Sequence, residues 1–349
     1  MSSKQIECKL SFISSLFENI EEGDYIFEYI KTLDIKNPIL VDVGAHHGSS
    51  ILPYIDRGWK IYAFEPDNTN RAHLLETCGN CDNVTIEKLA VSNEDNQEVS
   101  FFTSDESTGI SGLNSFHDTH EETQKVYTIT LESYCKQQNI QHIDFLKIDT
   151  EGYDKFVLEG LNFNKVKPKV ILTEFEDSKT LRLGYSFQEF AKYLTQKGYH
   201  VVVSEWFPIE KYGIQHKWRK FHLYPCTLED KTGWGNMIAF SDLKDYTDFL
   251  NMIDTIAVSK ITNKLKTYEN KIFNRDEAIE RLKNDREKQK VLIHNRDKAI
   301  LIEKDKNKKK QQKLDNRDDT IARLLNERDK LNILIKNRDA IIQKSKEKK

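Results

Sequence analysis

Ile39-Leu-Val-Asp-Val-Gly-Ala-His-His-Gly48 is the stretch that decides the fold of this chain of 349 residues. Residues 39–43 are apolar except for Asp42, which is typical of a buried strand of a parallel sheet that ends at a site. Gly44 follows at the point where the chain turns towards a helix, and Gly48 lets backbone and ligand approach closely. The stretch therefore predicts an α/β fold with a nucleotide cradle at the end of its first strand.

A second segment of the same kind is Ile143-Asp-Phe-Leu-Lys-Ile-Asp-Thr-Glu-Gly152. Its apolar run ends in Asp149 and Glu151, which we expect opposite Gly44 because parallel strands open their carboxyl ends at one edge of a sheet. Another strand, over residues 60–64, ends in Glu65, 21 positions after Gly44. A carboxylate at that spacing accepts both hydroxyls of a bound ribose, so the predicted ligand contains adenosine.

The turn itself narrows the choice of ligand. Gly44-Ala-His-His-Gly48 lacks the middle glycine that lets a pyrophosphate approach a helix N-terminus. Asp42 suits a cationic amine better than a phosphate. These features predict S-adenosylmethionine, which carries a ribose, an ammonium and a sulfonium but no phosphate, and they leave a nicotinamide-dependent dehydrogenase as a disfavoured alternative.

Four segments resemble the FkbM-type methyltransferases in order and spacing, namely residues 41–48, 64–67, 83–92 and 143–161. The resemblance covers about residues 36–240 and implies a Rossmann-like class I methyltransferase fold with a mostly parallel seven-stranded sheet. It departs from the family at His46 and His47, where Asn is more frequent, and at Glu132, where Asp is usual. The cofactor-binding residues that it implies, together with the turn, are Asp42, Gly44, Ala45, His46, Gly48, Glu65, Pro66, Leu89 and Ala90.

Methyl transfer from a sulfonium is an in-line displacement, so the enzyme must align an acceptor oxygen and remove its proton. Asp149, Glu151 and Lys147 are the predicted catalytic residues, with Glu151 facing the acceptor hydroxyl. The structural alternative is a helix cap at Thr150 with Glu151 in the first turn. Asp149, Glu151 and Glu174 are candidate ligands of a divalent cation, and His46 and His47 are further candidates for proton transfer.

The remaining pattern alternates between strands and helices. Residues 9–33 have helical apolar spacing, and residues 104–124 are expected to form a long loop. Strands are predicted over residues 38–43, 60–64, 84–88, 98–102, 143–148, 169–174, 199–205 and 236–240, and helices over 48–57, 68–77, 131–138, 153–160 and 187–197.

The C-terminal third follows a different pattern. From Val258 onward apolar residues recur every seven positions, which predicts a coiled coil of about twelve heptads. A 21-residue repeat of Asn-Arg-Asp begins at Asn274, Asn295, Asn316 and Asn337, and places an arginine in the core each time. The predicted organisation is an N-terminal helical segment over residues 1–35, a methyltransferase domain over 36–245, a linker over 246–257 and a coiled coil over 258–345.

Charge divides the chain in the same place. Residues 258–349 hold 28 Lys and Arg against 16 Asp and Glu, a net charge of +12, which leaves −15 for residues 1–257. The basic residues are interspersed with acids at coiled-coil spacing, so a solvated rod is favoured over nucleic-acid binding. We expect the rod to drive self-association as a parallel dimer or trimer, and its charge to favour an anionic membrane surface.

The compartment follows from what the sequence lacks. No apolar run reaches the ~18 residues of a membrane span, and the first residues have no signal-peptide core, so a cytoplasmic location is expected. Five scattered cysteines indicate free thiols, and the Cys78-x-x-Cys81 pair is read as a plain loop.

The predicted function is O-methylation of a sugar, glycan or other small hydroxyl acceptor. An alternative from another class is a scaffold whose coil is the function and whose sheet is vestigial.

Overall fold

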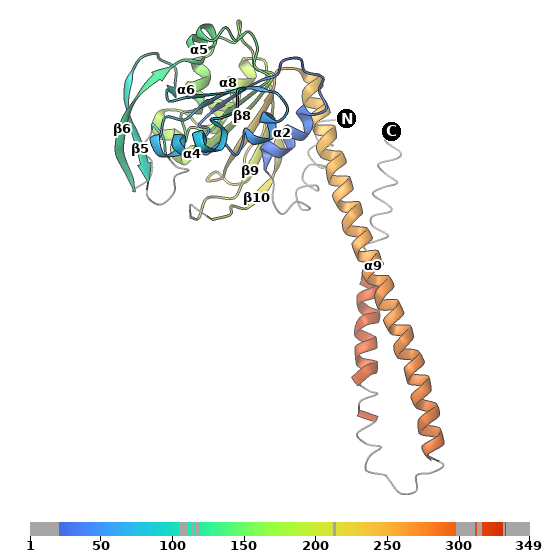
Figure 1. Ribbon diagram of the computed structural model, residues 1–349. Helices are drawn as coiled ribbons and strands as arrows, with labels where there is room; N and C mark the ends of the chain where they lie inside the picture. Colours follow the sequence, from blue (N-terminus) through green and yellow to red (C-terminus); the bar gives the residue numbers. More distant parts are fainter. Residues whose placement is uncertain are drawn as a thin grey trace. The chain divides into compact units, whose positions relative to one another are not determined.

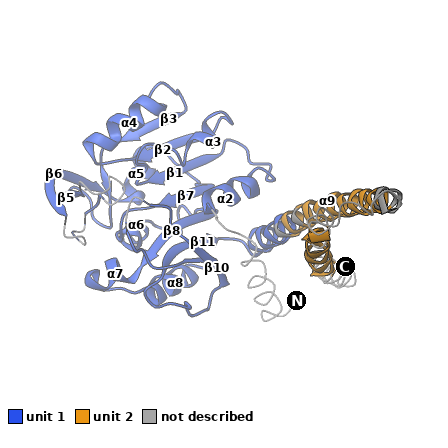
Figure 2. Ribbon diagram, turned by 90° about the horizontal axis from the view of Figure 1, so that it is seen from below, with its two compact units in different colours: residues 1–257 blue, residues 258–349 orange. Residues whose placement is uncertain are grey.

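The computed structural model describes residues 21–104, 111–113, 115, 119–211, 214–297, 311–312, 316–330 and 332. The chain divides into two compact units, residues 1–257 and 258–349 (Figure 2). The strands of the main sheet span Ile39–Val43 (β1), Lys60–Phe64 (β2), Val84–Glu87 (β3), Phe145–Ile148 (β7), Val170–Glu176 (β8), His200–Trp206 (β9), Trp218–Leu223 (β10) and Trp234–Phe240 (β11).

These eight strands lie in the order β10-β9-β11-β8-β7-β1-β2-β3. β3, β2, β1, β7 and β8 are parallel, whereas β11 is antiparallel to both β8 and β9. The predicted α/β fold with a mostly parallel sheet is confirmed, with one strand beyond the seven predicted. The additional strand is β10, at the edge of the sheet. Its pairing register with β9 shifts between Trp218 and Lys220. This irregularity interrupts the alternation of apolar and polar residues by which a strand is predicted from sequence.

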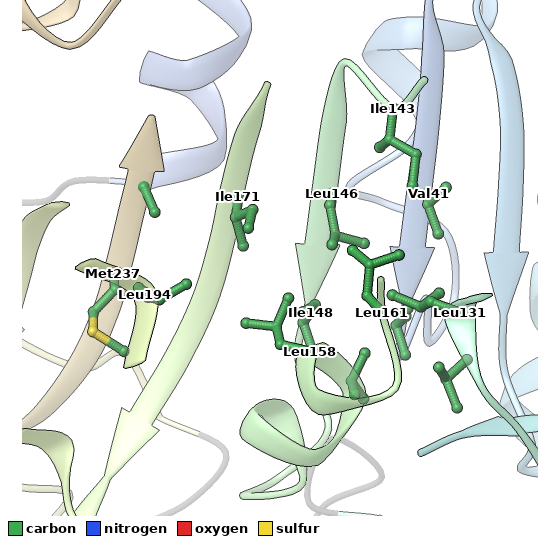
Figure 3. Packing of buried hydrophobic residues seen from close by; sticks show 14 of the residues in the cluster. Val41, Leu131, Ile143, Leu146, Ile148, Leu158, Leu161, Ile171, Leu194 and Met237 are labelled. Atoms are coloured by element: carbon green, nitrogen blue, oxygen red, sulfur yellow. The ribbon is translucent and has the colours of Figure 1, made fainter. Parts of the chain in front are cut away.

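Helices cover both faces of this sheet, because the central strands are apolar on both sides (Figure 1). They span Glu22–Ile30 (α2), Leu52–Ile55 (α3), Asn68–Cys78 (α4), Leu131–Gln137 (α5), Asp154–Glu159 (α6), Asp177–Thr180 (α7), Phe187–Gln196 (α8) and Leu243–Asp297 (α9). One core cluster joins the sheet to α2, α3, α4 and the start of α9, and the other joins it to α5, α6 and α8. Figure 3 shows part of the second cluster, including Val41, Leu146, Ile171, Leu131, Leu158 and Leu194.

Two local predictions differ from the structure. The expected loop over 104–124 overlaps β6 (His120–Ile129), which pairs antiparallel with β5 (Glu98–Ser104) and parallel with β4 (Ala90–Val91) in a separate three-stranded sheet. Its solvent-exposed start is polar, which hides a strand from an apolar pattern. The helix expected over 48–57 is reduced to the single turn of α3, with Pro53 near its start.

Residues 246–257, predicted to form a linker, belong to α9. Phe249 and Ile253 are fully buried in the first core cluster, and Tyr29 Oη donates a 2.7 Å hydrogen bond to Asp245 Oδ1. The first turns of α9 are therefore part of the globular unit. The helix continues without a break through Val258. The sequence pattern changes there because the residues before it pack in the globular unit and the residues after it belong to the second unit.

The second unit contains the rest of α9 and the helical residues 316–330. Arg275 Nη1 lies 2.7 Å from Glu327 Oε2, and Arg286 Nη2 lies 3.1 Å from Asp318 Oδ2. As the residue number increases from 275 to 286 along α9, the number of the paired residue decreases from 327 to 318. The two helical segments therefore run antiparallel within one chain (Figure 1). The predicted parallel coiled coil differs from this arrangement, in which the core arginine of the first repeat pairs with a carboxylate on the antiparallel segment.

Two further predictions concern the chain as a whole. The cysteines at 78, 81, 135 and 226 are free thiols. Among the described residues, no helix combines the length and apolarity needed to cross a membrane.

Phe249→Ala should lower the free energy of unfolding by about 3–5 kcal/mol, because it empties a fully buried site between α9 and the sheet. Leu243→Ala is the matched control, because the Leu243 side chain is 59% exposed in the same helix. Its free energy of unfolding should stay within about 0.5 kcal/mol of the wild-type value. Urea unfolding of both variants measures the difference. Equal stabilities would mean that the segment is a loose linker after all.

Candidate functional site

The site begins at a close contact between the ends of β1 and β7. Gly44 has φ +83°, and a Cβ there would lie 1.9 Å from the carbonyl oxygen of Asp149, so only glycine fits. The backbone N–H groups of Gly44 and Ala45 both donate to the carbonyl of Phe64, each at 3.0 Å. The turn after β1 is thereby fixed against the ends of β2 and β7 together.

Glu65 closes the end of β2. Its Oε2 accepts from the backbone N–H of His46 at 2.8 Å, and its Oε1 accepts from that of Asp67 at 2.8 Å. The residue is 5% exposed, and burial raises the pKa of its carboxyl to about 7 despite both hydrogen bonds. Each carboxylate oxygen can accept more than one hydrogen bond, so Glu65 keeps acceptor capacity for a ligand.

The turn after β7 holds the predicted catalytic carboxylates. Glu151 has φ +55°, a strained conformation for a residue with a side chain, and is 7% exposed. Asp154 fixes the turn by accepting from Thr150 Oγ1 at 2.9 Å and from Thr173 Oγ1 at 3.0 Å. Burial raises the pKa of Glu151 to about 7, although Lys179 opposes the shift. A carboxylate with that pKa is suited to general-base catalysis near neutral pH.

Asp42 and Lys147 form a pair that parallel register dictates, since they are direct partners on β1 and β7. Lys147 Nζ lies 3.3 Å from Asp42 Oδ1 and 3.4 Å from Asp149 Oδ2. Burial lowers the pKa of this lysine, but the two neighbouring carboxylates outweigh it and raise the pKa above its ordinary value. Ser50 Oγ donates to Asp42 Oδ2 at 2.5 Å, so both carboxylate oxygens of this fully buried residue have protein partners.

These turns enclose a cavity of about 640 Å³. Asp42 and Gly48 are outside its wall. A Cβ at Gly48 would meet Leu74 and Cys78 of α4, so this glycine permits helix packing and not ligand approach. The predicted residues that line the cavity are Gly44, Ala45, His46, Glu65, Pro66, Leu89, Ala90, Lys147, Asp149 and Glu151.

The paired histidines lie differently from one another. His46 lines the cavity, and burial, followed by the neighbouring His47, lowers the pKa of its imidazole. The two rings are stacked with centroids 3.7 Å apart, and His47 turns towards α4, where its Nε2 lies 3.2 Å from Asn70 Oδ1. Only His46 is therefore placed to touch a ligand in this cavity.

A second cavity of about 350 Å³ was not foreseen from the sequence. Asp149, Glu21, Glu22 and Asn236 lie in the walls of both cavities, so the two adjoin. The residues found only in the second wall are Glu174, Trp206, Ile214, Gln215, His216 and Trp234. The aromatic residues come from β9, β11 and the segment before β10, which tertiary structure alone brings together.

Lys179 is the other site residue that sequence reasoning missed. It lies in α7, is 1% exposed and contacts Glu151 Oε2 at 2.6 Å and Glu174 Oε1 at 3.3 Å. Burial raises the pKa of Glu174 well above its ordinary value, which Lys179 only partly offsets. A lone lysine in a short polar helix gave no signal that it would be buried.

A family model described as the methyltransferase FkbM domain matches residues 42–201. The protein named 2-O-methyltransferase NoeI, from Sinorhizobium fredii, is 24% identical over 168 residues, which are 44% of this chain and 69% of that protein.

Among solved structures, a precorrin-6y C5,15-methyltransferase from Geobacter metallireducens has a TM-score of 0.31 and 12% identity, covering 61% of this chain and 86% of its own. An rRNA methylase from Streptococcus thermophilus has a TM-score of 0.30 and 12% identity, covering 63% and 95%.

Gly44→Ala should destabilise the protein more than Gly58→Ala. Both glycines have positive φ, so both changes carry a backbone strain of about 1–2 kcal/mol. Only the new methyl at position 44 meets a backbone carbonyl, whereas nothing lies within 4 Å of one at position 58. Thermal unfolding should separate the variants by several degrees; a Gly44→Ala protein as stable as Gly58→Ala would contradict the close contact.

Proposed function

We propose, on the premise that residues 42–201 form an S-adenosylmethionine-dependent methyltransferase domain of the FkbM family, that this enzyme methylates a hydroxyl oxygen of a sugar or other small acceptor. The observation that carries the proposal is the position of Glu151. Its buried carboxylate lines the larger cavity, beside Asp149, which lies in the walls of both cavities. A base in the larger cavity, next to this junction, would lie near the point where a donor in the larger cavity and an acceptor in the smaller one meet.

The larger cavity fits the donor. Glu65 offers acceptors for the two ribose hydroxyls, and the turn at Gly44 and Ala45 lines the same cavity. Asp42, proposed from sequence as the partner of the amine, is already held by Ser50 and Lys147. Asp149, whose side chain is 48% exposed, is the better partner for a cationic amine. Bound there, S-adenosylmethionine supplies an electrophilic methyl group.

The smaller cavity suits a ring-shaped acceptor. Trp206 Nε1 donates to Glu22 Oε1 at 2.7 Å, and Trp234 Nε1 donates to the carbonyl of Phe207 at 2.9 Å. Because both indole N–H groups have partners, what the two rings offer a ligand is their apolar surface. The negative face of an aromatic ring attracts polarised C–H groups, such as those on one side of a sugar ring. Glu174 and Asn236 add polar groups for its hydroxyls.

In the proposed reaction the acceptor oxygen attacks the methyl carbon, the carbon–sulfur bond breaks, and the hydroxyl proton passes to Glu151. The products are a methyl ether and S-adenosylhomocysteine. The pKa of Glu151, raised to about 7, lets it hold this proton near neutral pH. The match to a 2-O-methyltransferase supports oxygen as the methylated atom.

Glu151→Gln should lower kcat by about 10²–10⁴-fold, the usual contribution of a general base, with little change in donor affinity. The assay is formation of S-adenosylhomocysteine from S-adenosylmethionine with a panel of methyl glycosides. Glu132→Gln is the control, since Glu132 pairs with Lys165 at the surface. Donor binding without transfer to any hydroxyl acceptor would contradict the proposed reaction, and full activity of Glu151→Gln would contradict the assigned base.

Donor affinity should fall as the pH is lowered through about 7, the raised pKa of Glu65. Ribose hydroxyls donate to the carboxylate, so protonation removes the acceptor that they need. Between pH 8 and pH 6 the Kd of S-adenosylmethionine should rise about tenfold if only the ionised form binds. Calorimetry would show weak binding with little pH dependence in Glu65→Gln, which cannot ionise. A wild-type Kd that is constant over this range would refute the role of Glu65.

A further inference from the structure

Three carboxylates surround the ammonium of one buried lysine in the first unit. Lys179 Nζ lies 2.6 Å from Glu151 Oε2, 3.3 Å from Glu174 Oε1 and 2.9 Å from Glu176 Oε2. Lysine is almost never fully buried unless it is paired, and this residue is 1% exposed. The lysine and its carboxylates therefore form a single electrostatic unit behind the cavity wall.

The local structure holds Lys179 in this place. α7 begins at Asp177 directly after β8, so Lys179 follows Glu176 by three residues and its side chain meets the strand end. A Cβ on Gly152 would lie 3.3 Å from the Cβ of Lys179, which shows how closely the lysine stem packs on the turn after β7. Tyr185 Oη donates to the carbonyl of Gly152 at 2.6 Å and fixes that turn.

Two of these carboxylates, Glu151 and Glu174, also belong to a cluster that could hold a metal. Oxygens of Asp149, Glu151 and Glu174 lie within 4.8 Å of one another, as in a cluster around a cation. Mg²⁺ needs its oxygens about 2.1 Å away in a near-octahedral shell. An ion shared by these three residues would lie close to the ammonium of Lys179, which already contacts two of them. The residues present therefore do not fit a divalent ion, because the ammonium of Lys179 already neutralises two of its three candidate ligands.

We propose that Lys179 is a built-in cation that substitutes for a divalent metal at the Asp149–Glu151–Glu174 cluster. The cluster becomes a site for Mn²⁺ or Mg²⁺ only when the ammonium is removed. The inference is independent of the proposed reaction, since it concerns metal binding and not methyl transfer. It also gives a reason why buried carboxylates cluster here: one fixed positive charge compensates several negative ones.

The test is a Mn²⁺ titration followed by electron paramagnetic resonance on the full chain. Lys179→Ala should bind Mn²⁺ about a hundredfold more tightly than the wild type, because a like charge a few ångströms away strongly weakens cation binding in a partly buried site. Lys179→Arg keeps the charge and should behave as the wild type does. Lys165→Ala is the control for loss of a surface lysine, since Lys165 is 67% exposed and pairs with Glu132.

Each outcome decides the matter. A wild-type Mn²⁺ site that Asp149→Asn abolishes overturns the proposal, as does a folded Lys179→Ala protein with no gain in affinity. If Lys179→Ala does not fold in the absence of metal, circular dichroism measures whether adding Mn²⁺ restores its folded structure. Recovery of the fold when Mn²⁺ is added supports the proposal, because the ion then replaces the ammonium; failure to fold with or without Mn²⁺ overturns it.

Discussion

The close approach of Gly44 to the carbonyl of Asp149 is the constraint on which the site depends. It requires β1 and β7 to be direct neighbours in the sheet, and it holds only while position 44 has no side chain. Because β2 is bound to the same turn through the carbonyl of Phe64, the ends of three strands are fixed at one point. The acidic residues that follow these strands are thereby brought to one cavity.

Buried charge is the second organising feature of the first unit. Asp42, Glu65, Glu151 and Glu174 are all carboxylates whose pKa burial raises, and only two lysines among the described residues are in ionic contact with them. Lys147 pairs with Asp42, and Lys179 pairs with Glu151. This division separates the pair formed across β1 and β7 from a cluster that reaches the smaller cavity.

Heptad spacing in the C-terminal third marks helix-to-helix contact but not its direction. Apolar positions repeated every seven residues suit parallel and antiparallel pairs equally, and the arginines of the repeat suit any carboxylate within reach. The ion pairs of Arg275 with Glu327 and of Arg286 with Asp318 set an antiparallel alignment within the chain. The heptad repeat by itself did not determine the direction in which the helices pair.

The sequence by itself determined the parallel sheet, the turns at Gly44 and Asp149 and the carboxylate at Glu65, because apolar runs ending in glycine and acid depend on local chemistry. It missed β10 and the first turns of α9, where a bulge and a change in helix surroundings obscure the pattern. Tertiary structure alone decided that Asp42 is covered, that Gly48 serves helix packing, and that Trp206, Trp234 and Lys179 join the site. Those roles depend on which side chains from distant segments become neighbours, and no local spacing encodes that.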